Sequence, residues 1–314
     1  MSRRVQASVL QALGVLLAGT LAAGSAGAAS ISVATYNVEN YTAADRRVDD
    51  IYRQGYPKPE AAKTALRAVI RALGADVLVL QEMGPAGYLA ELQRDLRAEG
   101  LDYPHGALAE ACDADRHLAV LSRIPLIGVR THADLEFPYA GGRARVKRGL
   151  LEVAVTVEGA ELTLFALHLR SRFTERPDDP NAARFREGEA AAIREFVLRR
   201  FPDPAAARFV ILGDCNDLRN SRPLRLLTRR GLTAIASPAD AVDCHGEAWT
   251  YYYRKDDTYS RVDYIFVSPG LAPALAGGGA RVYDGPGVRD ASDHRPVVVR
   301  LELRPADGGR PPGP

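Results

Sequence analysis

Cysteine is one of the scarcest residues in this chain, which has only three among 314 residues. Because the number is odd, at least one thiol stays unpaired in any arrangement of disulfides within the chain. None of the three lies near histidines at the ligand spacing of a zinc finger, so a structural zinc site of that kind is excluded. The chain also has a single tryptophan and no Trp-rich or long apolar loop, which counts against insertion into a lipid surface.

Net charge is nearly absent as well. The chain has 41 Lys and Arg residues against 39 Asp and Glu residues, and the first 28 residues hold two of the arginines and no acid. The rest of the chain is therefore close to neutral. A globally basic surface, common in proteins that bind nucleic acid non-specifically, is excluded, and any attraction to phosphate must be local.

An apolar stretch near the N-terminus is too short for a transmembrane helix. It covers residues 9–21, whereas a bilayer span takes about 20 such residues. Two arginines precede it, and residues 26–28 (Ala-Gly-Ala) follow as a small-residue cleavage site, a pattern typical of a secretory signal. We expect cleavage after Ala28 and a secreted or periplasmic bacterial protein without a stable membrane anchor.

The remaining sequence shows no internal repeat and no linker that would divide it. Residues 29–304 are long enough to form one domain with a sizeable core, and we expect that domain to be a monomer. Residues 305–314 are rich in proline and glycine, and we expect them to form a disordered tail.

The pattern of apolar residues predicts alternating strands and helices in the first half of the chain. A strand at residues 31–36, a helix at residues 59–73 that stops at Gly74, and a strand at residues 76–80 together predict a crossover unit. Further expected elements are a hairpin of residues 150–157 and 161–167, an amphipathic helix marked by Phe185, Ile193, Phe196 and Val197, and strands at residues 209–212, 250–253, 261–267 and 297–303.

Polar side chains stand where most of these strands end. In sheets of α/β proteins, such residues line the functional crevice, so the pattern predicts one shared site. They are Asn37 after the first strand, Gln81 and Glu82 after the second, His168 after the hairpin, Asp214 and Asn216 within Gly-Asp-Cys-Asn after residues 209–212, Asp263 inside residues 261–267, and Ser292-Asp293-His294 before the last strand.

This ordered set resembles the endonuclease/exonuclease/phosphatase superfamily, which includes deoxyribonuclease I. The resemblance extends from residue 31 to about residue 303 and covers all six motifs in the family's order. It implies an α/β fold of the deoxyribonuclease I type, a four-layer sandwich in which two packed mixed β-sheets are flanked by helices.

The ligand types indicate a hard divalent cation. Carboxylate and amide oxygens suit Mg²⁺, and Mn²⁺ is possible, because these ions take part of their shell from water and substrate phosphate. By resemblance, Glu82 is the strongest metal-ligand candidate, followed by Asp293 and Asn37.

The resemblance assigns the proton chemistry to histidines. His294 resembles the general base that helps a water attack phosphorus, and Asp263 resembles the acid that orients it. Asp214 and Asn216 resemble the pair that holds the nucleophile and the phosphate. His168 resembles the second histidine of deoxyribonuclease I, which contacts phosphate or assists the leaving oxygen.

Taken singly, these residues also have ordinary structural explanations. Asn37 could cap a turn, Glu82 could be a solvated acid, and Asp263 could pair with Arg261. Cys215 fills the variable position of Gly-Asp-x-Asn and is expected to be a buried small hydrophobe. Cys112 and Cys244 stand in polar, loop-like stretches and are the pair that could form a disulfide after export.

Two basic clusters lie near the predicted site, and each could cradle phosphate or be a solvated loop. Arg170 and Arg148 are the candidates for substrate binding. The stretch from Trp249 to Tyr253 could supply a ring that stacks on a base, or could simply be a strand. The first cluster is Arg143, Arg145, Lys147 and Arg148, and the second is Arg170, Arg172 and Arg176.

The sequence thus predicts a secreted, Mg²⁺-dependent phosphodiester hydrolase, a nuclease that cuts DNA or RNA. The alternatives are a phosphatase or a phospholipid or sugar-phosphate phosphodiesterase of the same superfamily, and a non-catalytic member that binds phosphate or a protein on a retained fold.

Overall fold

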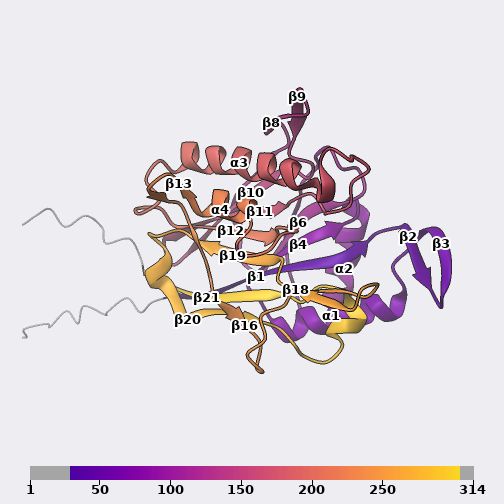
Figure 1. Cartoon of the computed structure of the whole chain (residues 1–314). Coiled ribbons are helices and arrows are strands. Elements are labelled where there is room, and N and C mark those ends of the chain that lie inside the picture. The colour runs from indigo at the N-terminus through magenta and orange to yellow at the C-terminus, as the bar shows by residue number, and fades with distance from the viewer. Residues whose placement is uncertain (1–28, 305–314) are drawn as a thin grey trace, which may run out of the picture.

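Two β-sheets pack face to face, and helices cover their outer faces in the computed structural model of the protein, which describes residues 29–304 (Figure 1). The signal sequence expected at residues 1–28 and the tail expected at residues 305–314 lie outside the described residues. Among those described, no helix is long and apolar enough to cross a membrane.

The first sheet has seven strands, and the strand that opens the described chain lies in its middle. That strand, β1, pairs antiparallel with β21 and parallel with β4, as the predicted crossover unit requires. In spatial order the strands are β16 (Ala241–Val242), β20 (Leu275–Val282), β21 (Val297–Leu303), β1 (Ala29–Tyr41), β4 (Val77–Met83), β6 (His117–Ser122) and β5 (His105–Leu108).

The second sheet has six strands. The hairpin predicted at residues 150–157 and 161–167 forms its β10 and β11, and the strand predicted at residues 209–212 lies parallel to β11. In spatial order the strands are β15 (Ser237–Pro238), β19 (Asp263–Val267), β12 (Phe209–Asp214), β11 (Ala160–His168), β10 (Leu150–Val157) and β7 (Leu126–His132).

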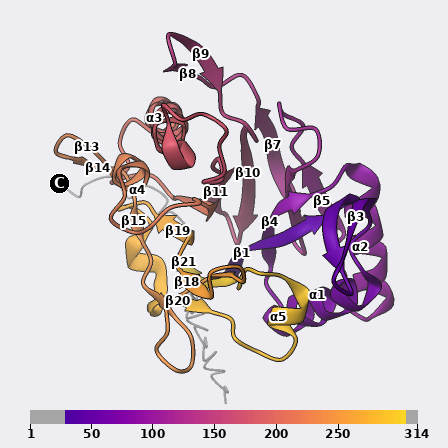
Figure 2. The same ribbon diagram turned by 45° about the vertical axis from the view of Figure 1, so that its right-hand side comes forward.

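Three apolar clusters separate the four layers. One fills the space between the sheets and includes Val79 of the first sheet together with Val153 and Leu164 of the second. A second lies under α1 (Glu60–Leu73) and α2 (Ala86–Ala98) on the first sheet, and a third under α3 (Ala183–Arg200) and α4 (Arg222–Thr228) on the second. Figure 2 shows the two helical layers on opposite sides. The predicted fold class is confirmed.

Helix α1 starts and stops where the sequence predicts. Pro59 precedes its first residue, Glu60, and Gly74 follows its last, Leu73. Gly74 has a φ of 56°, in the left-handed region that glycine enters without steric cost, and its N–H donates to the carbonyl of Ile70. This turn directs the chain back into β4.

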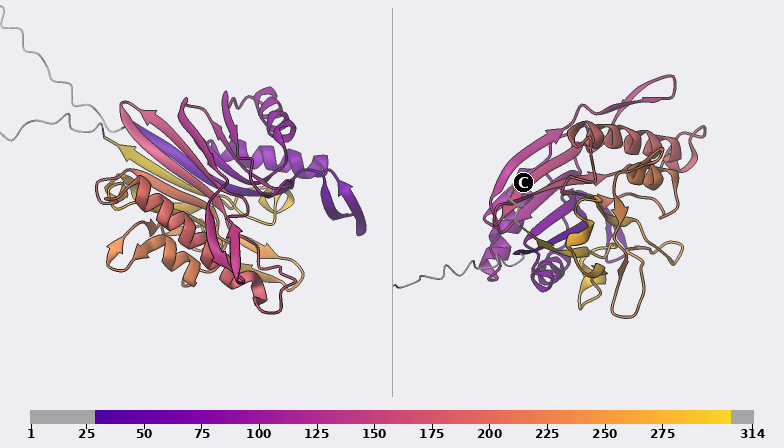
Figure 3. Two further views of the ribbon diagram at one scale, coloured as in Figure 1. Left: turned by 90° about the horizontal axis from the view of Figure 1, so that it is seen from above. Right: turned by 90° about the vertical axis from the view of Figure 1, so that its left-hand side faces the viewer.

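Four small hairpins project from the sandwich. The pair nearest the N-terminus stands away from the body in Figure 3, directly after β1. The hairpins are β2 (Ala44–Val48) with β3 (Ile51–Tyr56), β8 (Glu136–Tyr139) with β9 (Gly142–Arg145), β13 (Arg229–Arg230) with β14 (Thr233–Ala234), and β17 (Tyr251–Tyr253) with β18 (Thr258–Ser260); the remaining helical turns are α5 (Val288–Ala291), η1 (Pro180–Ala182) and η2 (Ala272–Ala274).

The three cysteines are free thiols, so the disulfide that the sequence allows between Cys112 and Cys244 is not formed in this structure. The neighbours of the two residues anchor them to different partners, because Asp113 pairs with Arg148 whereas Asp243 pairs with Arg295. Cys215 is fully buried in the cluster under α3 and α4, as predicted.

Candidate active site

Strand pairing brings the predicted polar residues to one end of the sandwich. In the second sheet, Asp214 lies opposite both His168 and Asp263 in the registers of β12 with β11 and β19. In the first sheet, Asn37 of β1 lies opposite Gln81 of β4, and Glu82 is the next residue of β4. On the other side of β1, Thr35 pairs with Val297, which follows the Asp293–His294 segment closely in the chain. Each sheet therefore contributes about half of the site.

A glycine allows β11 and β12 to approach closely at this end. Gly213 has a φ of 144°, and a Cβ at this position would collide with the backbone of Leu167. Without a side chain at Gly213, the two strands can place Asp214 beside His168, with 3.4 Å between the Asp214 Oδ2 and the His168 Nε2.

Several site residues adopt a left-handed backbone although they are not glycine. Glu39, Asn40, Glu82 and Asn216 have φ values between 47° and 62°. Glu82 lies where the register of β4 against β6 shifts. Such conformations cost on the order of 1 kcal/mol each and persist only where the surroundings fix them, as they often do at functional sites.

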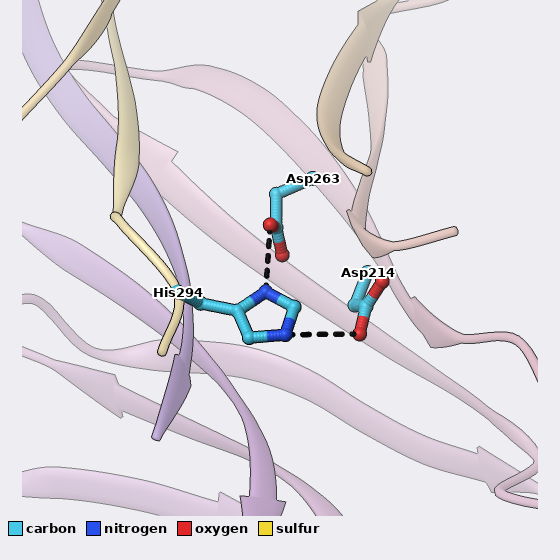
Figure 4. A group of neighbouring side chains, drawn as sticks. All are labelled: Asp214, Asp263 and His294. Carbon is cyan, nitrogen blue, oxygen red and sulfur yellow. Dashed lines mark hydrogen bonds and ion pairs between the residues drawn. The ribbon is translucent and has the colours of Figure 1, made fainter. Parts of the chain in front are cut away.

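His294 lies at the centre of an acidic group (Figure 4). Its Nδ1 is 2.8 Å from the Asp263 Oδ2, and its Nε2 is 3.9 Å from the Asp214 Oδ2 and 4.0 Å from the Asp293 Oδ1. The ring also stacks at a tilt on Tyr251, with 4.7 Å between the centroids. Asp263 therefore pairs with His294, while the Arg261 guanidinium donates to the carbonyl of Ala239.

The acids around His294 shift its protonation. Burial alone would lower the pKa of His294, but the charge and hydrogen bond of Asp263, and then the charge of Asp214, outweigh burial and raise that pKa well above 6.5. Burial, followed by repulsion from Asp263, raises the pKa of Asp214 to about 7. With Asp263 on Nδ1, the imidazole can exchange its proton through Nε2.

Asp214 is tied to both sheets by hydrogen bonds. Its Oδ1 accepts from the backbone N–H of Asn216 at 2.7 Å, and its Oδ2 accepts from the amides of Asn37 at 3.1 Å and Asn216 at 3.2 Å. The Asn216 amide also donates to the carbonyl of Leu169. These contacts hold the Asp214 carboxylate in a fixed orientation.

Asn37 lies between Asp214 and Glu82 and donates to both carboxylates. The Asn37 amide donates to the Glu82 Oε1 at 3.3 Å, and the backbone N–H of Asn40 donates to the Glu82 Oε2 at 2.9 Å. The Asn37 Oδ1 accepts from the N–H of Glu39. Asn37 thus links two acids from different sheets, a contact that a simple turn cap would not make.

Asp293 completes the acidic group. Burial is the main reason that its pKa rises to about 7, and the charges of Glu39 and Glu82 raise it further against the opposing effect of His294. Since 38% of the side chain remains exposed, solvent screens part of these effects. Mutual repulsion among carboxylates is what a cation between them would relieve, so the oxygen donors fit a hard divalent ion.

A second grouping of possible metal ligands is chemically less suited to that ion. Asp214, Asp263 and His294 place one ligand atom each within 4.8 Å of one another. However, the Nδ1 of His294 is already bonded to Asp263. Glu82, Asp293 and Asn37, which offer oxygen atoms alone, stay the metal ligands that the sequence predicts.

His168 is buried, and its surroundings favour the neutral ring. Burial is the largest cause that lowers its pKa well below 6.5, and the nearby charges of Arg148 and His294 add to it. Its Nδ1 has no hydrogen-bond partner among the described residues. A buried ring nitrogen without a hydrogen-bond partner marks a position where a substrate oxygen could bind.

The residues of the two predicted basic clusters do not lie together in the structure. Arg143 and Arg145 lie on the β8–β9 hairpin and pair with Glu136, whereas Arg148 is buried, 3.0 Å from Asp113. Arg148 and Arg170 line a cavity with Glu82. Arg172 and Arg176 pair with the acids Asp217 and Asp178, respectively.

Sequence reasoning missed three residues at the site. Arg116 donates to the Asn40 side chain at 2.8 Å, Lys58 is a buried cation 3.4 Å from Glu39, and Tyr251 covers the His294 ring. Only Tyr251 had a sequence signal, in the aromatic stretch predicted to be either a stacking surface or a strand. It forms a strand and also faces the site.

Comparison with known proteins identifies the family. The sequence profile of the Endonuclease/Exonuclease/phosphatase family matches residues 34–294. No curated protein sequence matches the chain. The matched residues run from β1 to His294 and include all the site residues described above.

Several solved structures share the fold. Sphingomyelinase C from Streptomyces griseocarneus is 20% identical, with a TM-score of 0.59 over 87% of this chain and 99% of that one. The human nocturnin catalytic domain, which has a bound sulfate, is 16% identical, with a TM-score of 0.62 over 88% and 95%. Truncated TDP2 from Caenorhabditis elegans is 15% identical, with a TM-score of 0.57 over 87% and 98%. At these identities the likeness shows the fold.

Proposed function

The chain belongs to the endonuclease/exonuclease/phosphatase family, a family of phosphoester hydrolases, and from this premise we propose that it is a metal-dependent nuclease that hydrolyses DNA or RNA. The single observation that carries the proposal is the bond between His294 and Asp263, with the free Nε2 of the ring facing Asp214 and Asp293. This arrangement pairs a general base with acids suited to a metal.

In the proposed reaction, His294 accepts a proton from the attacking water at Nε2. Asp263 fixes the tautomer through Nδ1 and stabilises the positive charge that the ring acquires. Asp214 and Asn216, linked by two hydrogen bonds, orient the water against the phosphate. His168 donates a hydrogen bond from a ring N–H to a phosphate oxygen or to the leaving oxygen, and the leaving oxygen takes its proton from solvent.

Glu82 and Asp293 would hold a divalent ion, Mg²⁺ or Mn²⁺, with Asn37 as a further oxygen donor. When bound, this ion polarises the phosphoryl oxygen and offsets the charge of the transition state. The protein's own part is to keep the two carboxylates in place, which the Asn37 amide and the Asn40 N–H do for Glu82.

The test is to replace Glu82, Asp293 or His294 by alanine. Each variant should lose Mg²⁺-dependent hydrolysis of plasmid DNA while keeping the circular dichroism spectrum of the wild type. Asp290→Ala, which removes an exposed acid three residues before Asp293, is the matched control and should stay active. Full activity in any of the three test variants would remove that residue from the mechanism.

A panel of substrates separates nuclease activity from its alternatives. The purified protein is assayed with Mg²⁺ on plasmid DNA, RNA, a phosphomonoester and sphingomyelin. Turnover of sphingomyelin alone would reassign the chain as a phospholipid phosphodiesterase, and turnover of the monoester alone as a phosphatase. No turnover of any of them would favour a non-catalytic binding protein.

Export is part of the same proposal. A cleavable signal at residues 1–28 would take the nuclease to the periplasm or beyond, where it would meet extracellular nucleic acid. N-terminal sequencing of the mature protein from the periplasm or medium should start at Ala29. A full-length chain that stays in the cytoplasm would contradict export.

A further inference from the structure

A cavity with basic walls lies beside the candidate metal site. Its volume is about 340 Å³, and Glu82 and Asn40 form part of its wall. The other walls come from the loop before β6, the loop before β10 and the loop after β11. These three segments bring four cations to the cavity: Arg116, Lys147, Arg148 and Arg170.

The four cations are only partly neutralised. Lys147 and Arg148 share one carboxylate, that of Asp113, at 3.5 Å and 3.0 Å. Arg116 donates to the neutral side chain of Asn40, and Arg170 stacks on the ring of Phe185. Neither of these two arginines has a carboxylate partner within 4 Å among residues 29–304. The cavity therefore keeps an excess of positive charge.

Arg148 is the buried member of this group. It is 5% exposed, its Nε lies 3.0 Å from the Asp113 Oδ2, and its Nη1 donates to the carbonyl of Leu169 in the loop after β11. These contacts hold its guanidinium at the cavity wall. Guanidinium groups bind the oxygens of phosphate well, so the two arginines without a carboxylate partner, Arg116 and Arg170, fit an anionic ligand in the cavity.

We propose that this cavity binds a second phosphate of the substrate, next to the phosphate that is hydrolysed. The inference rests on the proposed function, because Glu82 belongs to both the cavity wall and the candidate metal site. Phe173 also lines the cavity and is 75% exposed, so its ring can contact the base or sugar between the two phosphates. A choline phosphodiester has no second phosphate, and its cation would be repelled.

The second phosphate can be an internal linkage of a nucleic acid or a terminal phosphate, and dinucleotides distinguish the two. We compare kcat/KM for the thymidine dinucleotide TpT with that for TpT carrying a 5′- or a 3′-terminal phosphate. One of the phosphorylated forms should react about tenfold faster. If an internal linkage can fill the cavity, a thymidine tetranucleotide without terminal phosphates should have the same kcat/KM as the faster phosphorylated dinucleotide. If only a terminal phosphate can fill it, the kcat/KM of the tetranucleotide should be close to that of TpT.

Substitution of Lys147 tests whether the cavity is the cause. Its side chain is 36% exposed, so Lys147→Met should fold normally, and it should reduce the tenfold preference to near parity. Arg143→Met removes a charge from the same basic cluster but lies on the β8–β9 hairpin, and it should keep the preference. A wild-type enzyme that cleaves TpT as fast as both phosphorylated forms would overturn the proposal.

Binding without metal provides a readout that does not need hydrolysis. Isothermal titration in EDTA compares adenosine 3′,5′-bisphosphate with adenosine 5′-monophosphate on the wild type and on Lys147→Met. The bisphosphate should bind about tenfold more tightly to the wild type only. Equal affinities would reject the second phosphate site even in an active nuclease, whereas a bisphosphate preference in a protein that hydrolyses nothing would reject the nuclease and keep the site.

Discussion

At the scale of single residues, His294 has its protonation set by two acids from the opposite sheet. Asp263 holds Nδ1 at 2.8 Å, and Asp214 lies 3.9 Å from Nε2. Together they raise the pKa of His294 well above 6.5 against the effect of burial. An imidazole made this basic is a strong proton acceptor once it is neutral, which suits the general-base role that we propose for His294.

Asp263→Asn should lower kcat on the order of 10⁴-fold, because the amide cannot stabilise the charged ring and can hold the wrong tautomer. The substitution removes the main acid that raises the pKa of His294, so this pKa should fall towards 6.5. Proton NMR of the metal-free protein measures that titration directly. Asp178→Asn, in an exposed ion pair with Arg176, should leave the titration where it is; an unchanged pKa in Asp263→Asn would show that Asp263 does not set it.

The residues of the site differ in how far the sequence could predict them. Asn37, Glu82, Asp214, Asp263 and His294 were predictable to share a site because each stands in an ordered motif at a strand end. The sequence carries no such signal for Arg116 or Lys58. Their contacts join segments from separate parts of the fold, and only the packed structure shows which cations face the acids.

At the scale of elements, helix α3 does more than cover the second sheet. Its Glu189 is fully buried and accepts two backbone N–H groups, from Lys147 at 2.9 Å and from Arg170 at 2.7 Å. These residues belong to the two loops that carry cations to the cavity. One carboxylate therefore fixes the distance between the loop before β10 and the loop after β11.

Glu189→Gln should reduce the free energy of unfolding by about 2 kcal/mol, since the amide nitrogen cannot accept one of the two hydrogen bonds. Urea denaturation followed by circular dichroism measures this loss. Glu187→Gln, on the same helix and in a partly exposed pair with Arg222, should cost less than about 0.5 kcal/mol. Equal losses in the two variants would contradict a special role for Glu189.

The regular elements were easier to predict than the hairpins. Helix α1 and strand β21 follow from apolar periodicity, because one face of each is buried. Strands β4, β10, β11 and β12 follow from apolar runs, because most of their residues are buried on both faces. The β2–β3 and β8–β9 hairpins are mostly exposed and have no such pattern. As a result, the sequence could not separate Arg143 and Arg145, on a hairpin, from Lys147 and Arg148, in the cavity wall.

At the scale of the whole molecule, the candidate metal ligands and the proton-transfer group depend on both sheets being docked together. Asn37 of the first sheet bonds Asp214 of the second, and His294 beside the first bonds Asp263 of the second. The two hydrogen bonds join the sheets at one end of the apolar layer that lies between them. A cation that relieves the repulsion among the acids should therefore stabilise the entire sandwich.

Mg²⁺ should raise the free energy of unfolding by about 2.7 kcal/mol at a concentration 100-fold above its Kd, because it binds the folded protein only. Differential scanning calorimetry with and without EDTA measures this linkage. The double variant Glu82→Ala/Asp293→Ala should show no increase, while Glu136→Ala, at an exposed arginine pair, should behave as the wild type. Stabilisation of equal size in the double variant would place the cation elsewhere.

The pairing of β1 with β21 also sets when activity can begin during synthesis. Ala29 lies opposite Leu303, so β1 can form its antiparallel pairing only after β21, the last strand of the domain, has been synthesised. A nascent chain released before residue 293 has neither Asp293 nor His294, and its central sheet has a gap beside β1. An incomplete translation product of this hydrolase therefore lacks both the last strand of its central sheet and the bond between His294 and Asp263, so the site assembles only after the whole domain has been synthesised.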